Sequence, residues 1–268
     1  MIWQGSAGSW YLIPAEPVGI VHFLGGAFVG TAPQLTYKWL LEQLADAGYA
    51  VITTPFTNSF DHLAIARQVL NRFENILERL QNSQQLAYLP VYGVGHSMGC
   101  KIHLLINSLF NVKRAGNILM SYNNFPVKRS VPFLDQVDSI PFLEKLDLNK
   151  SIDNFEFTPS PAETNEIITT SYQTRRNLLI QFENDTIDQT TDLAPILLGR
   201  FPNMVVSRKI AGNHLTPLGQ EIDWQMGEGF SPLDAIGQWV KQGLSKDLQT
   251  LKNEICFWLN PADYVVKK

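Results

Sequence analysis

The sequence predicts an α/β protein with a mostly parallel central sheet and helices on both faces, and three observations lead to this fold class. Short apolar runs alternate with segments of helical periodicity along most of the chain, as in successive β-α units. Residues 19–24, GIVHFL, are almost wholly apolar, which is typical of a strand buried on both faces of a parallel sheet. Residues 92–99, YGVGHSMG, combine the end of a strand, a tight turn and the start of a helix.

The first half of the chain divides into alternating strands and helices after an N-terminal hairpin. Gly48 has the usual position of a glycine that ends a helix, and Asp61 or Ser59 is suited to cap the next one. We therefore expect a hairpin within residues 3–14, strands at 19–24, 49–55, 89–94 and 114–121, and helices at 35–47, 61–80 and 101–110.

The regular pattern stops between residues 122 and 172 and then resumes. Five prolines interrupt this stretch, and we interpret it as a lid-like insertion into a single domain that spans residues 1–268. Ser160, Pro161 and Glu163 match a capping box with proline at the first helical position. The pattern predicts a helix at 161–172, a strand at 177–182, a helix at 193–199, a strand at 204–210, and one or two helices within 232–259.

Composition excludes several classes of function. The 268 residues are 45% hydrophobic with a net charge of −4 and a pI near 5.7, which argues against a nucleic-acid partner. Two distant cysteines indicate neither a disulfide framework nor a zinc site, and no segment resembles a signal peptide or a membrane span. We expect a soluble cytoplasmic protein with no integral membrane segment, no cofactor and no metal, and peripheral membrane contact stays open.

The turn Gly95-His96-Ser97-Met98-Gly99 is the strongest candidate for a reactive site. A serine hydroxyl is a weak nucleophile, so it needs a neighbouring base and must be raised above the sheet on a strained turn from strand to helix. Glycine on either side lets strand and helix approach closely. The N–H of Met98, at the start of the following helix, is placed to stabilise a developing oxyanion.

A second glycine-rich turn, residues 25–30, follows the apolar run 19–24. It lacks the glycine and lysine spacing of a phosphate-binding loop. We expect it to be an oxyanion loop in which the N–H groups of Gly26 and Ala27 complete the site begun by Met98. The alternative is a turn that only allows the next helix to begin.

An acid and a base follow later strands. Asp185 comes after the predicted strand 177–182, Asp188 is the alternative acid, and His214 follows the strand 204–210. Of the other histidines, His22 and His103 lie in apolar runs and fit a packed core, His62 begins a helix and fits a capping or exposed position, and His96 adjoins the serine, so its side chain is expected to point away from it. His214 is therefore the expected base.

The order serine, aspartate, histidine along the chain resembles the α/β-hydrolase superfamily. Residues 95–99 are similar to its nucleophile elbow and residues 24–28 to its oxyanion loop. The sequences SYNNFP at 121–126 and GNHLTP at 212–217 also resemble an uncharacterised hydrolase-like family of cyanobacteria and plastids. Two departures concern loop geometry: Leu24 stands where many relatives have histidine, and Phe182 where many have glycine.

The predicted function is a serine hydrolase that cleaves an ester, thioester or amide of a small or lipophilic substrate through a Ser97–His214–Asp185 triad. Apolar side chains of the insertion favour a lipophilic substrate, although they would equally hold the lid on the domain; these are Phe125, Phe133, Leu134, Phe142, Leu143 and Leu146. Two alternatives stay open: a non-catalytic binding or scaffold protein with this fold, and a lyase or cofactor-free oxygenase that uses the same triad differently.

Overall fold

The computed structural model describes residues 1–83, 86, 88–127, 129, 156–218 and 244–262. Its centre is an eight-stranded sheet in the order β1-β2-β4-β3-β5-β6-β7-β8, in which β1, β2 and β4 pair antiparallel and the remaining pairs are parallel. This mixed, mostly parallel sheet confirms the predicted fold class. The strands are β1 (Gln4–Ser6), β2 (Ser9–Leu12), β3 (Gly19–Leu24), β4 (Tyr49–Thr53), β5 (Val91–His96), β6 (Gly116–Met120), β7 (Asn177–Phe182) and β8 (Val205–Ile210).

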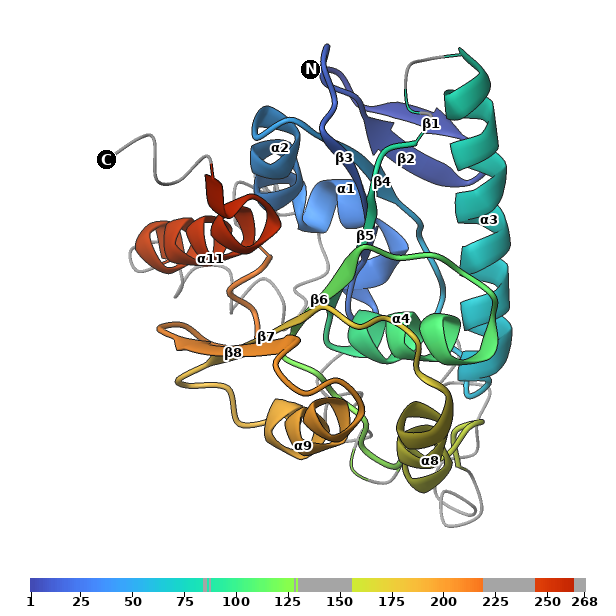
Figure 1. Cartoon of the computed structure of the whole chain (residues 1–268), viewed down its shortest axis with the longest axis vertical. Helices are drawn as coiled ribbons and strands as arrows, with labels where there is room; N and C mark the ends of the chain where they lie inside the picture. Colours follow the sequence, from blue (N-terminus) through green and yellow to red (C-terminus); the bar gives the residue numbers. More distant parts are fainter. Residues whose placement is uncertain (84–85, 87, 128, 130–155, 219–243, 263–268) are drawn as a thin grey trace, which may run out of the picture.

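Helices cover both faces of the sheet (Figure 1). The helices are α1 (Pro33–Thr36), α2 (Lys38–Asp46), α3 (His62–Ser83), α4 (Met98–Leu109), α8 (Pro161–Ser171), α9 (Thr190–Arg200) and α11 (Leu244–Leu259), with a short 3₁₀ turn, η1 (Val29–Thr31). Helices α2 and α11 pack on one face, and α3, α4, α8 and α9 pack on the other.

Alternating side chains along the central strands build the two cores. Leu178 and Ile180 of β7 join the cluster under α2 and α11, whereas Leu179 between them packs with α4, α8 and α9. All three are buried. Both faces of these strands are covered, which agrees with their nearly continuous apolar sequence.

One predicted helix is interrupted. The sequence predicts a continuous helix over 35–47, but α1 and α2 are separated at Tyr37, where φ is −115° and ψ is 17°. The Tyr37 side chain is fully buried, and its hydroxyl group accepts the Gly26 N–H at 2.8 Å and contacts His96 Nδ1 at 2.7 Å. These distant partners explain why the chain leaves helical geometry at this residue.

Most other differences concern the ends of elements. Helix α4 begins at Met98, three residues before the prediction, α3 continues to Ser83, and α9 begins at Thr190. The expected cap of α3 is present, because Asp61 Oδ1 accepts the Ala64 N–H at 2.8 Å. The predicted C-terminal stretch 232–259 is described only from Leu244, where α11 begins.

The insertion predicted at 122–172 is described at its two ends, and residues 130–155 lie outside the described residues. Helix α8 starts with the predicted capping box: Glu163 N–H donates to Ser160 Oγ, and the Glu163 carboxylate accepts the Ser160 N–H at 2.8 Å. This helix packs beside α4 and α9. Within the described residues, no helix has the length and apolar character needed to cross a membrane.

Candidate active site

The predicted site residues gather at one edge of the sheet because the parallel strands end there together. Ser97 follows β5, Asp185 follows β7 and His214 follows β8. The oxyanion loop follows β3, which is hydrogen-bonded to β5. In open α/β sheets this carboxyl edge is where ligands bind.

Ser97 occupies a strained turn between β5 and α4. Its φ of 54° and ψ of −119° are rarely adopted by residues other than glycine, at a cost of about 1–3 kcal/mol. The turn is held by the Ser97 N–H, which donates to the Met120 carbonyl at 2.9 Å, and by the Ser97 carbonyl, which accepts the Cys100 N–H at 3.0 Å. Ser97 is 8% exposed, so the turn presents a largely enclosed hydroxyl at the sheet edge.

The glycines of this turn allow three backbone segments to meet. A Cβ atom at Gly99 would lie 2.2 Å from the Leu24 carbonyl oxygen and 2.6 Å from that of Gly25, and one at Gly95 would lie 2.8 Å from the Cys100 nitrogen. The start of α4 is therefore in direct backbone contact with the end of β3. This approach brings the oxyanion loop next to Ser97.

Asp185 and His214 form a buried hydrogen-bonded pair. His214 Nδ1 lies 2.8 Å from Asp185 Oδ2, and the Asp185 side chain is fully buried while that of His214 is 18% exposed. Asp185 Oδ1 accepts the Ile187 N–H at 3.0 Å. Burial by itself raises the pKa of Asp185, but its hydrogen bonds and the neighbouring His214 together outweigh burial and hold that pKa below its usual value. The carboxylate is therefore ionised and fixes the proton of His214 on Nδ1, which leaves Nε2 as the basic atom.

Asp188, the alternative acid, lies against different groups. Its Oδ1 accepts the Thr190 N–H at 2.7 Å, at the start of α9, and burial raises its pKa. Only Asp185 of these two carboxylates has a hydrogen bond to His214 in the described residues.

The two predicted donors of the oxyanion loop, Gly26 and Ala27, differ in whether their N–H groups have an acceptor. The Gly26 N–H donates to the Tyr37 hydroxyl at 2.8 Å, which differs from the expectation that it faces the oxyanion. Among the described residues, no acceptor is recorded for the N–H of Ala27 or of Met98. Gly26 lies against the nucleophile, since a Cβ there would be 3.3 Å from Ser97 Cβ, so its neighbour Ala27 is also close to the site.

The Ser97 hydroxyl and the His214 ring are not hydrogen-bonded to each other in the described part of the chain. Such bonds are often long or misaligned without substrate and tighten in the reacting complex. The arrangement thus holds an oriented base and a strained serine on neighbouring loops.

The two sequence motifs beyond the elbow shape the acid and base loops. In GNHLTP, Thr216 Oγ1 accepts the Asn213 N–H at 2.8 Å and Asn213 Oδ1 accepts the Leu215 N–H at 2.9 Å. In SYNNFP, Asn123 donates to the Ile187 carbonyl at 3.1 Å, and the Asn124 N–H donates to Gln189 at 2.7 Å. These bonds fix the segments that carry His214 and Asp185.

The other histidines are buried. His62, expected at a capping or exposed position, does begin α3. It is buried rather than exposed, because its accessibility is 4% and it stacks on Phe157 at 4.4 Å. His22 and His103 lie in the core as expected. His96 is the residue whose role the sequence did not indicate, since its Nδ1 contacts Tyr37 and its Nε2 lies 2.8 Å from the His214 carbonyl oxygen.

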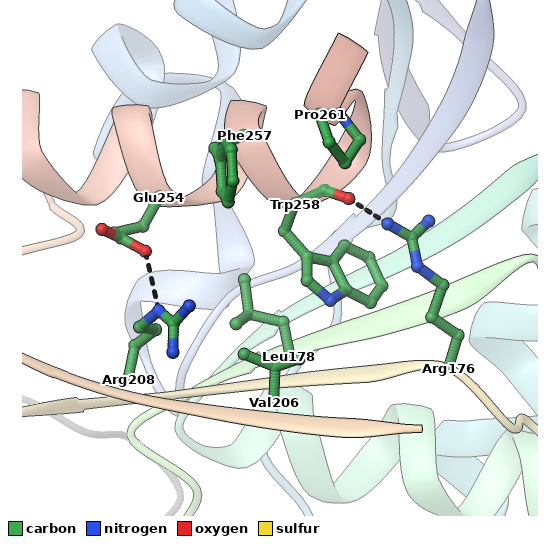
Figure 2. A pocket seen from close by; sticks show the side chains of 8 residues that line it. All are labelled: Arg176, Leu178, Val206, Arg208, Glu254, Phe257, Trp258 and Pro261. Carbon is green, nitrogen blue, oxygen red and sulfur yellow. Dashed lines mark hydrogen bonds and ion pairs between the residues drawn. The ribbon is translucent and has the colours of Figure 1, made fainter. Parts of the chain in front are cut away.

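A surface pocket of about 250 Å³ lies between α11 and strands β7 and β8 (Figure 2), and Ser97 is not among its lining residues. The two arginines that line the pocket both interact with residues of α11. Arg176 stacks on the Trp258 ring at 3.9 Å and donates to the Trp258 carbonyl, and Arg208 pairs with Glu254 at 3.2 Å. We interpret this pocket as part of the interface at which α11 packs on the sheet. The described residues contain no cluster of three or more histidine, cysteine or acidic side chains that could hold a metal ion.

Solved structures share this fold at low sequence identity. A soluble variant of monoglyceride lipase from Saccharomyces cerevisiae is 14% identical with a TM-score of 0.61, covering 97% of this chain and 94% of that one. A thermostable carboxyl esterase from Bacillus coagulans is 14% identical with a TM-score of 0.56, covering 97% of both chains. These similarities show that the chain has the α/β-hydrolase fold.

Comparison with curated proteins gives no match. Residues 2–261 match the family described as "Protein of unknown function (DUF1350)". The match confirms the resemblance to an uncharacterised family, and this chain belongs to the DUF1350 family.

Proposed function

We propose that the protein is a serine hydrolase that cleaves an ester, thioester or amide through an acyl-enzyme on Ser97. The observation that carries the proposal is the buried 2.8 Å pair of Asp185 and His214, on loops adjacent to a serine with φ of 54°. Backbone strain of this kind clusters at active sites, and an imidazole oriented by a carboxylate is the base that activates a serine hydroxyl.

The reaction follows from these groups. Ser97 Oγ attacks the acyl carbon while His214 Nε2 takes its proton, and the bond from carbon to the leaving group breaks as His214 returns that proton to the leaving group. Water then adds to the acyl-enzyme with its proton again passing through His214, which releases the acid and restores Ser97. Asp185 stabilises the imidazolium that forms in both steps.

The N–H groups of Met98 and Ala27 are the proposed oxyanion donors. Met98 lies at the start of α4, where the helix dipole favours negative charge. Loss of one such donor raises the barrier by about 3 kcal/mol. Gly26, whose N–H is held by Tyr37, contributes by its small size beside Ser97.

The substrate class rests on the apolar side chains of the insertion. Phe125 lies at its described start, and the remaining apolar residues that favour a lipophilic acyl group, from Phe133 to Leu146, lie outside the described residues. Esters with short and long acyl chains are therefore the first substrates to compare.

A fluorophosphonate probe tests the proposal. Ser97 Oγ displaces fluoride from phosphorus, so active protein gains one covalent adduct per chain, detected by intact mass. We expect stoichiometric labelling of the wild type and none of Ser97→Ala, with a loss of at least about 1,000-fold in rate for His214→Ala. Folded wild-type protein that stays unlabelled by both a large and a small probe would overturn the proposal.

Two observations favour the alternative, a non-catalytic binding protein. The Gly26 N–H is occupied, and the Ser97–His214 link is open in the described residues. The probe separates the two functions, because a binding protein without an activated serine retains its fold and takes no label.

A further inference from the structure

A chain of hydrogen bonds connects the oxyanion loop to the loop that carries His214. The Gly26 N–H lies 2.8 Å from the Tyr37 hydroxyl, which lies 2.7 Å from His96 Nδ1, and His96 Nε2 lies 2.8 Å from the His214 carbonyl oxygen. Tyr37 is fully buried and His96 is 1% exposed. Residues from four separate parts of the sequence are thus joined inside the protein.

The chemistry of the groups determines which atom donates and which accepts in each of these hydrogen bonds. The His214 carbonyl only accepts, so His96 carries a proton on Nε2. Burial lowers the pKa of His96 to about 3, so the ring is neutral and Nδ1 accepts. Burial also raises the pKa of Tyr37, which keeps its hydroxyl protonated. Tyr37 therefore donates to His96 and accepts from Gly26, and every donor in the chain has an acceptor.

Local structure is adapted to these bonds. Tyr37 interrupts the helical segment between α1 and α2, and a Cβ at Gly25 would lie 2.7 Å from its ring. Removing the hydroxyl would leave both the Gly26 N–H and His96 Nδ1 buried without a partner, which costs about 1–3 kcal/mol per group. Breaking one of these hydrogen bonds therefore costs free energy, because it leaves buried polar groups without a partner.

We propose that Tyr37 and His96 are positioning residues for the reaction: together they fix the spacing between the oxyanion loop and the backbone of the catalytic base. Tyr37 holds Gly26, the residue before the proposed donor Ala27, and His96 holds the backbone of His214 from the position before Ser97. Donors and base must keep their geometry within about 0.5 Å for efficient catalysis. This inference rests on the proposed serine hydrolase.

The first test compares two tyrosines. Tyr37→Phe removes the linking hydroxyl, whereas Tyr122→Phe removes a buried hydroxyl that has no hydrogen-bond partner among the described residues. We expect Tyr37→Phe to slow fluorophosphonate labelling by about 10- to 100-fold, because small misplacements in a site cost this much. Tyr122→Phe should label at the wild-type rate.

The second test asks whether the two residues act as one unit. His96→Gln keeps a donor and an acceptor and should recover most of the rate that His96→Leu loses. The double variant Tyr37→Phe with His96→Leu should label no more slowly than His96→Leu alone, since the losses of a shared unit do not multiply. Losses that multiply would overturn the inference.

A third measurement does not depend on turnover. Hydrogen exchange should accelerate in Tyr37→Phe at both residues 25–30 and residues 212–218, and in Tyr122→Phe at neither. If wild-type protein labels and Tyr37→Phe labels equally fast with unchanged exchange, the positioning role is overturned while the proposed function stands. If wild-type protein does not label, the proposed function fails and the positioning role fails with it.

Discussion

Asp185 and Asp188 are three residues apart and have pKa shifts in opposite directions. Burial raises the pKa of Asp185, but its hydrogen bonds together with the neighbouring His214 outweigh burial and lower that pKa. The pKa of Asp188 is raised by burial, and this residue accepts the Thr190 N–H at the start of α9. The sequence could not separate the two, because both follow the same strand and their difference depends on where His214 lies.

Replacing these two carboxylates separately should have different effects. Asp185→Asn should slow labelling and hydrolysis by about 10,000-fold, because the amide favours the wrong tautomer of His214. Asp188→Asn should keep most activity and lower the free energy of unfolding by about 1 kcal/mol or less, since the asparagine side-chain oxygen can also accept the Thr190 N–H. Probe kinetics and urea denaturation measure both effects. The assignment of the acid would be contradicted if Asp188→Asn were the inactive variant.

Most elements could be predicted because strands buried on both faces and amphipathic helices have distinct apolar patterns. The strands 19–24 and 177–182 and the capping box at Ser160 agree with the structure. The break at Tyr37 could not be predicted, because its cause is a hydrogen bond to His96, 59 residues away. For the same reason no structural role could be predicted for His96, since no local pattern indicates a bond to the His214 backbone.

At the scale of elements, the start of α4 lies directly against the end of β3. A Cβ at Gly99 would lie 2.2 Å from the Leu24 carbonyl oxygen, whereas one at Gly199 in α9 would meet nothing within 4 Å. Two glycines in helices thus have very different surroundings. They form a matched pair for mutation to alanine.

Gly99→Ala should destabilise the protein by about 1–3 kcal/mol or more, because backbone atoms must move. Gly199→Ala should stabilise it by at most about 1 kcal/mol, because alanine is the better helix former. Denaturation midpoints of the two variants provide the comparison. Equal stability of both variants would mean that α4 and β3 are not in backbone contact.

At the scale of the whole molecule, four histidines are buried in the neutral state. Burial lowers the pKa of His62, His96 and His103 to about 3 each, and lowers that of His22 well below its ordinary value. In the unfolded chain the same groups titrate near 6.5. Between these values the unfolded state binds more protons than the folded state, so stability falls as the pH falls.

The free energy of unfolding should therefore fall by about 4 kcal/mol between pH 6.5 and 5.5, at about 1 kcal/mol per histidine. Urea denaturation across this range measures the slope. His62→Phe, which keeps an aromatic ring beside Phe157, should reduce this pH-dependent fall in the free energy of unfolding by about a quarter. Constant stability from pH 7.5 to 5.5 would contradict the neutral buried state of these side chains.

The central claim is that Ser97 forms a covalent acyl-enzyme, and its most direct test is mass spectrometry of the protein quenched in acid during reaction with p-nitrophenyl butyrate. We expect a butyryl adduct on the peptide containing Ser97, formed together with p-nitrophenolate and lost again as the substrate is exhausted. Ser97→Ala should show neither adduct nor turnover. Release of p-nitrophenolate that continues in Ser97→Ala, or wild-type turnover without an adduct on Ser97, would contradict this account.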